Sequence, residues 1–132
     1  MHLKIITHEK VVFDSDVDEI YTKTVDGEIG ILKNHVPFMA ALDIGVTKAV
    51  KDDKSEMFTT MGGILQFNNN EALILTPTSE QGEHIDEIRA NEALKRAKAR
   101  LADNNADIDS KRAEAAIARA MARLKASMNK RQ

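Results

Sequence analysis

The stretch of residues 77–102, PTSEQGEHIDEIRANEALKRAKARLA, contains the change from one kind of sequence pattern to another. It opens with Pro77 and a polar segment, Thr78 to His84, whose Gly82 and polar residues are typical of a linker. From Ile85 onward the chain has neither Gly nor Pro and is rich in Ala, Leu, Lys and Arg, which favour helix. The sequence therefore divides into residues 1–84 and a helical part, residues 85–132.

Two helices are predicted in the second part. The first runs from Glu87 to Ala102 with Asp86 as its N-cap, and Asp103-Asn104-Asn105 ends it. Asp107 or Asp109 then caps a second helix that ends near Met128. Because the connection is short, the two helices should form an antiparallel hairpin.

Each predicted helix has an apolar stripe and an arginine edge. At about 100° per residue, the first stripe contains Ala90, Ala93, Leu94, Ala97 and Leu101, and the second Ile117, Met121, Leu124 and Met128. Arginine recurs at i, i+7 and i+11 on both helices: Arg89, Arg96 and Arg100, then Arg112, Arg119 and Arg123. Alanine-rich seams bury little area, so we expect a weakly held, movable hairpin.

The first part has the pattern of short β-strands. Apolar segments are separated by turn signals at about 8 to 12 residues, which indicates a sandwich or a barrel: Leu3–Thr7, Val11–Phe13, Val17–Val25, Gly45–Val50, Glu56–Met61, Ile64–Phe67 and Ala72–Thr76. Asp52-Asp53-Lys54 and Asn68-Asn69-Asn70 should turn two antiparallel hairpins. Gly62-Gly63 indicates a bulge or a close backbone approach.

Charge is distributed unevenly along the chain. The net charge of −2 combines an acidic first part with a basic second part that holds all seven arginines. Arginine presents a fork that suits carboxylates and phosphates, so the hairpin is suited to grip anions. The alternative is a solvated basic helix face.

Several functional classes lack their residues in this sequence. There is no cysteine, and the four histidines have no paired spacing, so no metal site is expected. The sequence has no phosphate-binding glycine loop and no nucleophile elbow, which argues against an enzyme such as a small β-sandwich hydrolase. An acidic chain with one Tyr and four Phe does not favour nucleic-acid binding. Asp14-Ser15-Asp16-Val17-Asp18 begins like a calcium loop but lacks its Gly and Glu.

Three motifs are shared with a known family. The segment from Gly27 to Pro37, GEIGILKNHVP, resembles the G-E-L-G-I-L-P-G-H-x-P signature of the epsilon subunit of F-type ATP synthases. Ile85-Asp86-Glu87-Ile88-Arg89-Ala90 resembles its I-D-x-x-R-A motif, and the segments at 111–114 and 119–124 resemble its R-A-E…R-A-x-x-R-L ending. The resemblance covers essentially the whole chain in the right order. Without it, the first segment is a strand followed by a turn that Gly30, Asn34 and Pro37 require.

Two departures from the family pattern concern local contacts. Lys33-Asn34 replaces the usual Pro-Gly before His35, which Asn34 can accommodate if its backbone is left-handed. Met61 replaces the usual Ser before Gly62-Gly63.

The resemblance implies an α+β fold and a non-catalytic role in the central stalk. In such a fold an N-terminal antiparallel β-sandwich is followed by a C-terminal antiparallel two-helix hairpin. The implied partners of the sandwich are the gamma subunit and the membrane c-ring, with Glu28 and the turn of His35 as the expected c-ring contact. The hairpin is expected to extend toward the catalytic alpha and beta subunits and inhibit ATP hydrolysis, and its thin seams suit two states that differ by a few kcal/mol.

The resemblance also implies a regulatory ATP site in the folded hairpin, with no required cofactor. The matching residues are Glu80, Ile85, Asp86, Arg89, Ala90, Arg96, Arg119 and Arg123. Their arginines would pair with phosphate oxygens, and Glu80 and Asp86 with adenine or ribose. Alternatively, Asp86 only caps the helix and Arg89 pairs with a neighbouring carboxylate.

Location follows from the same reasoning. The apolar runs are too short for a membrane span and no signal peptide is evident, so membrane association is expected only through the complex. We expect the cytoplasmic face of a bacterial plasma membrane, or an organelle-encoded thylakoid counterpart. The alternative function is a free-standing nucleotide-sensing module.

Overall fold

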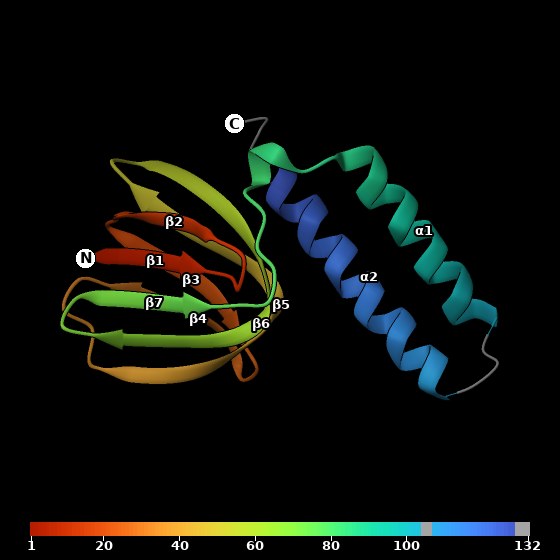
Figure 1. Ribbon diagram of the computed structural model, residues 1–132, viewed down its shortest axis with the longest axis horizontal. Coiled ribbons are helices and arrows are strands. Elements are labelled where there is room, and N and C mark those ends of the chain that lie inside the picture. Colours follow the sequence, from red (N-terminus) through yellow and green to blue (C-terminus); the bar gives the residue numbers. More distant parts are fainter. Residues whose placement is uncertain (104–106, 129–132) are drawn as a thin grey trace.

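The computed structural model describes residues 1–103 and 107–128, and the side chains of 107–109 lie outside this description. Within these ranges the chain forms seven strands followed by a short 3-10 helix and two α-helices (Figure 1). In chain order these are β1 (His2–Ile6), β2 (Val11–Asp16), β3 (Glu19–Thr24), β4 (Gly27–Leu32), β5 (Phe38–Lys51), β6 (Lys54–Asn68), β7 (Glu71–Leu75), η1 (Gly82–His84), α1 (Glu87–Asp103) and α2 (Asp107–Ser127).

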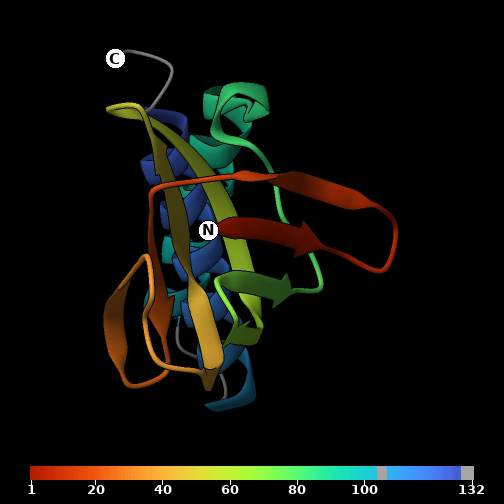
Figure 2. The ribbon, with the colours of Figure 1, turned by 90° about the vertical axis from the view of Figure 1, so that its left-hand side faces the viewer.

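The seven strands form one sheet that folds over into a β-sandwich (Figures 1 and 2). The order is β2-β1-β7-β6-β5-β3-β4, and the long strands β5 and β6 lie at its centre. The strand pairs are antiparallel except β1 and β7, which run parallel. The core is filled from both ends of this order: Leu3 and Ile5 of β1 and Ile74 of β7 pack with Ile20 of β3 and Ile31 of β4, all fully buried. The predicted α+β fold, a sandwich followed by a two-helix hairpin, is confirmed.

The two predicted hairpin turns are present. Asp52 and Asp53 connect β5 to β6, and Asn69 and Asn70 connect β6 to β7. All four residues have φ between 51° and 63°. A two-residue hairpin loop with two positive φ angles matches the twist of the strands, and Asn and Asp tolerate it best after Gly.

The double glycine lies inside one strand, whereas the sequence pattern predicted two. Gly62 and Gly63 both have positive φ, and β6 continues through them. A Cβ on Gly63 would lie 2.0 Å from the carbonyl oxygen of Leu75. The predicted close approach of another backbone is therefore confirmed, and it explains why two short apolar runs form one strand.

Two strands are longer than the sequence pattern predicted. β2 extends to Asp16 because His2 of β1 contacts both Asp14 and Asp16 across the strand pair. β5 begins at Phe38, seven residues before the predicted start at Gly45, and its first half pairs with β6 from Phe67 to Gly63. The first half of β5 is a strand because it pairs with the long strand β6, and the local sequence pattern did not indicate this pairing.

The helical hairpin forms as predicted on either side of residues 104–106, which lie outside the described residues. The side-chain caps proposed at Asp107 and Asp109 also lie outside the description, because it does not include those side chains. Asp86 is the N-cap of α1, because its Oδ1 accepts the backbone N–H of Arg89 at 3.1 Å. α2 packs between the sandwich and α1: it contacts β5 and β6 on one side and α1 on another (Figure 1). In the part of the chain described, neither helix has the length and hydropathy of a membrane span.

The apolar stripe predicted for α1 holds, whereas that predicted for α2 is wrong in two of its four residues, because Ile117 and Leu124 are half-buried and the two methionines are not. Ala90 and Ala97 of α1 are buried, with Ala93, Leu94 and Leu101 half-buried. In α2, however, Met121 and Met128 are more than half exposed. The buried residues of α2 are instead small: Ala113, Ala120, Ala122, Ala126 and Ser127. A helix packed between a sheet and another helix needs small side chains on two faces, and a single-stripe pattern does not detect this arrangement.

Candidate functional site

An open cavity of about 660 Å³ lies where the linker meets the two helices. Its lining residues come from the linker, from α1 and from α2: Glu80, His84, Ile85, Asp86, Arg89, Ala90, Glu92, Ala93, Arg96 and Arg123. Seven of the eight residues predicted for a nucleotide site are among them. We call this cavity the arginine pocket.

The first turns of α1 build one wall of the arginine pocket. Ile85 and Ala90 are buried at 2% and 3% exposure and form its apolar base. The side chain of Asp86 already accepts a hydrogen bond as the N-cap of α1. Arg89 and Arg96, seven residues apart, lie on the same side of the helix, and both are exposed. Two arginine side chains therefore border the pocket on the side of α1.

The linker and α2 supply the opposite wall. Nε of Arg123 donates to Oε1 of Glu80 at 2.8 Å, and both side chains are half-buried. The backbone of Glu80 is in turn held by Thr59 of β6. Arg123 is thus fixed to the sandwich through Glu80, although it belongs to the helical hairpin.

Arg119 is the predicted site residue that the structure leaves outside the pocket lining. It lies one turn before Arg123 on α2 and is half-buried. Three lining residues were missed from the sequence: His84, Glu92 and Ala93. Helical spacing was a signal for two of them, because Glu92 and Ala93 follow Arg89 and Ala90 by three residues and share their side of α1.

The arginine pocket has the chemistry of an anion site. Three guanidinium groups, on Arg89, Arg96 and Arg123, border one cavity whose base is apolar. Three carboxylates also border it: Glu80 is paired with Arg123, Asp86 caps α1, and Glu92 is exposed on α1. A ligand with several anionic oxygens and a flat apolar group would match this combination of arginines and buried Ile85 and Ala90.

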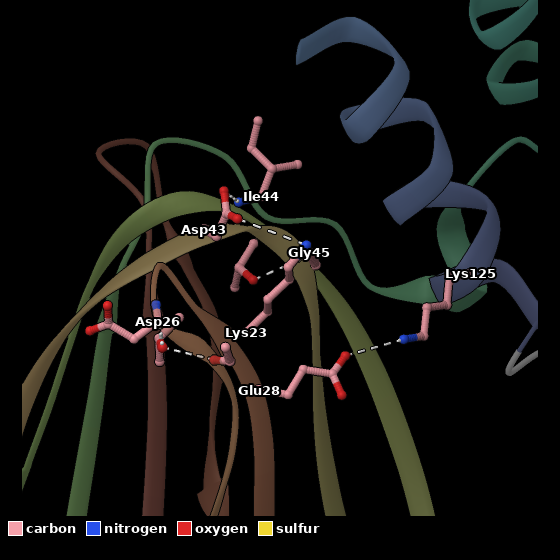
Figure 3. Close-up of polar contacts among 10 residues, drawn as sticks. Lys23, Asp26, Glu28, Asp43, Ile44, Gly45 and Lys125 are labelled. Carbon is pink, nitrogen blue, oxygen red and sulfur yellow. Dashed lines mark hydrogen bonds and ion pairs between the residues drawn. The ribbon is translucent and has the colours of Figure 1, made fainter. Parts of the chain in front are cut away.

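The two residues predicted to contact a partner lie apart. Glu28 is the second residue of β4, whereas His35 follows the other end of that strand. Glu28 faces α2, where its Oε1 lies 3.8 Å from Nζ of Lys125 (Figure 3). Close by, Lys23 of β3 pairs with Asp43 of β5 at 3.8 Å (Figure 3). Glu28 is therefore next to the end of the helical hairpin, away from the loop that holds His35.

The loop of His35 is well anchored. Asn34 has φ 68°, the left-handed backbone expected where the family has Gly, and its backbone N–H donates to Oδ1 of Asn70 at 2.7 Å. Nδ2 of Asn70 donates in return to Oδ1 of Asn34 at 3.0 Å. The His35 ring packs on Phe38 and Phe67, with centroids 4.9 and 5.9 Å away. Apolar side chains around the loop remain exposed: Leu32, Val36 and Met39.

Comparison with known proteins gives the same family for both parts of the chain. Residues 1–82 match the beta-sandwich domain of the "ATP synthase, Delta/Epsilon chain" family, and residues 83–128 match its long alpha-helix domain. The chain is 43% identical over 100 residues to the ATP synthase epsilon chain of Carboxydothermus hydrogenoformans, covering 76% of this chain and 75% of that one. It is 44% identical over 110 residues to the ATP synthase epsilon chain of Symbiobacterium thermophilum, covering 83% and 79%.

The fold is also shared with a solved structure. A chain in the mitochondrial ATP synthase of Euglena gracilis, solved as an OSCP/F1/c-ring assembly, superposes with a TM-score of 0.82 at 22% identity. The match covers 96% of this chain and 79% of that chain. With family matches over residues 1–128 and relatives above 40% identity, this chain belongs to the family of ATP synthase epsilon chains.

Proposed function

We propose that this chain is a non-catalytic rotor subunit in the central stalk of a proton-translocating ATP synthase, and that its hairpin both binds regulatory ATP and restrains ATP hydrolysis. The observation that carries the regulatory part is the arginine pocket, where guanidinium groups from both helices border one cavity. The stalk role is supported by family membership and by relatives that are named ATP synthase epsilon chains.

In this proposal the sandwich joins the rotor. The gamma subunit and the c-ring are its partners, and the anchored loop of His35, with exposed Leu32, Val36 and Met39, is the better c-ring contact. Glu28 is the weaker candidate, because it already faces Lys125 of α2. The complex would hold the chain at the cytoplasmic face of the membrane as a peripheral subunit.

The arginine pocket suits ATP for electrostatic and steric reasons. Phosphate oxygens would pair with Arg89, Arg96 and Arg123, and arginine binds such groups with two parallel hydrogen bonds. The adenine would lie against buried Ile85 and Ala90. Glu80 is a poorer candidate to hold the base or the ribose than the sequence suggested, since Arg123 occupies its Oε1.

ATP in this pocket would favour the folded hairpin. The lining residues come from three segments, which are close together only while α1 and α2 lie against each other and against the linker. A ligand that binds one of two states shifts the population toward that state. ATP would therefore oppose the extended state, in which the hairpin reaches the alpha and beta subunits and inhibits hydrolysis.

Calorimetric titration of the full chain with ATP tests the pocket. Arg89→Ala should weaken binding by about tenfold or more, because a charged hydrogen bond contributes about 1.5–3 kcal/mol. Arg100→Ala is the matched control: it removes an exposed arginine of the same helix that does not line the cavity, and should leave the binding constant unchanged. Equal affinities in the two variants would reject the assigned site.

Inhibition is tested in the assembled enzyme. Truncation after Glu83 removes both helices and leaves the sandwich. We expect the truncated complex to hydrolyse ATP faster than the complex with the full chain. Equal rates would show that the hairpin does not restrain hydrolysis, while co-purification of the chain with gamma tests the stalk role separately.

A further inference from the structure

Thr59 holds the linker on the sandwich. It lies in β6 and is fully buried. Its backbone N–H donates to the carbonyl oxygen of Glu80 at 2.9 Å, and its Oγ1 accepts the backbone N–H of Glu80 at 2.9 Å. Both polar backbone groups of Glu80 are therefore bound to one threonine, so the glutamate side chain leaves the linker from a fixed point.

The neighbouring residue strengthens this attachment. Gln81 forms an isolated antiparallel bridge with Phe58, and its Nε2 donates to Oε2 of Glu56 at 2.9 Å. The linker thus runs along β6 for two residues before η1 begins. The backbone of Glu80 is therefore held against β6, and its side chain extends toward α2 from that fixed position.

Glu80 transmits this position to the arginine pocket. Its Oε1 accepts a hydrogen bond from Nε of Arg123 at 2.8 Å. That bond uses one edge of the guanidinium group and does not involve its two terminal nitrogens, which carry four further N–H groups.

We infer that Thr59 and Glu80 are positioning residues, which hold Arg123 at the edge of the arginine pocket with its terminal nitrogens free for an anionic ligand. The inference rests on the proposed nucleotide pocket. It adds Thr59 and Glu80, which would affect the ligand only through the position of Arg123. An arginine held in advance loses less rotamer entropy when it binds a phosphate. The same contacts tie ligand binding to docking of α2 on the sandwich.

The contrasting role for Glu80 is that of a competing anion. Phosphate would then have to displace the Glu80 carboxylate from Arg123. Any change that weakens the bond between Glu80 and Arg123 would therefore increase the affinity for ATP. Substituting Glu80 cannot separate the two roles cleanly, because it changes charge and position together. Substituting Thr59 can, because it leaves the carboxylate in place and removes one of the two hydrogen bonds that hold the backbone of Glu80.

The experiment compares Thr59→Val with Thr60→Val and Thr59→Ser by ATP calorimetry on the full chain. Thr60 is an adjacent, equally buried threonine whose hydroxyl lies 3.2 Å from that of Thr47 and which no bond connects to Glu80 in the described part of the chain. Thr59→Val should weaken ATP binding about five- to tenfold, since one backbone hydrogen bond is lost. Thr60→Val and Thr59→Ser, which keeps the hydroxyl, should bind like the original chain. Equal affinity of the two valine variants, or tighter binding by Thr59→Val, would overturn the inference.

A second measurement needs no nucleotide. The Nε–H resonance of Arg123, assigned through its loss in Arg123→Lys, should exchange slowly with water in the original chain and in Thr60→Val. It should exchange several times faster in Thr59→Val. If the original chain fails to bind ATP, the proposed pocket function fails, but this measurement still decides whether Thr59 positions Arg123. Unchanged exchange in Thr59→Val would reject the positioning role.

Discussion

Gly82 and Ala126 approach so closely that a Cβ on Gly82 would lie 2.2 Å from the carbonyl oxygen of Ala126. Gly82 begins η1 in the linker, and Ala126 is fully buried near the end of α2. Met57 of β6 is also near, with its carbonyl oxygen 3.3 Å from the same Cβ position. The end of α2 therefore docks where only glycine leaves room for it.

Gly82→Ala should weaken docking of the hairpin. The added methyl group meets backbone rather than a flexible side chain, so the helix has to move, at a cost of about 1–3 kcal/mol. We expect faster amide hydrogen exchange in α2, while exchange in the sandwich core stays slow. Glu83→Ala changes the exposed neighbour and is the control. Unchanged exchange in Gly82→Ala would contradict the tight docking.

The adjacent glycines of β6 should respond differently to alanine. A Cβ on Gly63 would meet Leu75 at 2.0 Å, whereas a Cβ on Gly62 has its nearest contact, the Leu42 carbonyl oxygen, at 3.7 Å. Both have positive φ, so Gly62→Ala should cost about 1–2 kcal/mol from backbone strain alone. Gly63→Ala should cost about 3 kcal/mol or more, because strain and overlap combine. Urea unfolding compares the two, and equal losses would show that the strands adjust freely.

Stability should depend on pH through His2. Its Nδ1 lies 2.8 Å from Oδ1 of Asp16 and its Nε2 contacts Asp14, and these hydrogen bonds raise the pKa of His2 above 6.5. The contribution is therefore complete below that pH and is lost as the pH rises through the folded-state pKa.

Urea unfolding at several pH values measures this contribution. As the pH rises from below 6.5 through the raised pKa of His2, the original chain should lose stability in a step that His2→Gln lacks. His8→Gln, which alters an exposed histidine outside this cluster, should keep the step. The same hydrogen bond lowers the pKa of Asp16 below 3.8, so its contribution is lost in the opposite direction, as the pH falls through that lowered value. A step that persists in His2→Gln would assign it to another group.

The loop of His35 should loosen when its amide clamp is removed. Asn70→Gly keeps the left-handed backbone of the turn but deletes both hydrogen bonds to Asn34. We expect the amide of His35, which donates to the Leu32 carbonyl at 3.1 Å, to exchange about tenfold faster.

Asn69→Gly is the matched control for the loop. It alters the other turn residue, which also has a positive φ, and leaves the clamp intact. Equal exchange of the His35 amide in the two glycine variants would show that the aromatic packing of His35 holds the loop by itself.

Local sequence was sufficient where one residue type satisfies one local requirement. Asp86 caps α1 because its carboxylate accepts an orphan N–H of the first turn, and the paired Asp and Asn turns follow from their tolerance of positive φ. Five of the seven predicted residues that line the arginine pocket lie in segments that match a family pattern, and the same resemblance implied Glu80 and Arg96. Their role in ATP binding stays a prediction until titration.

Other features could not be predicted from the sequence because they depend on contacts between segments that are distant in the chain. Nothing local indicates that Arg123 bonds to Glu80, 43 residues away, or that Glu28 faces Lys125 rather than the loop of His35. The buried face of α2 was mispredicted for the same reason, since hydrophobicity pointed to Met121 and Met128 while packing on two sides selected alanines.

The sequence alone thus determined the division into an acidic sandwich and an arginine-rich hairpin, because strand patterns, caps and charge are properties of neighbouring residues. Tertiary contacts determine which arginines border one pocket, what holds them, and how the hairpin docks. Those features depend on the close approach of Gly82 to Ala126 and on the bonds from Thr59 through Glu80 to Arg123. Such contacts bring together residues far apart in the chain, and their energies appear only when the surfaces are packed.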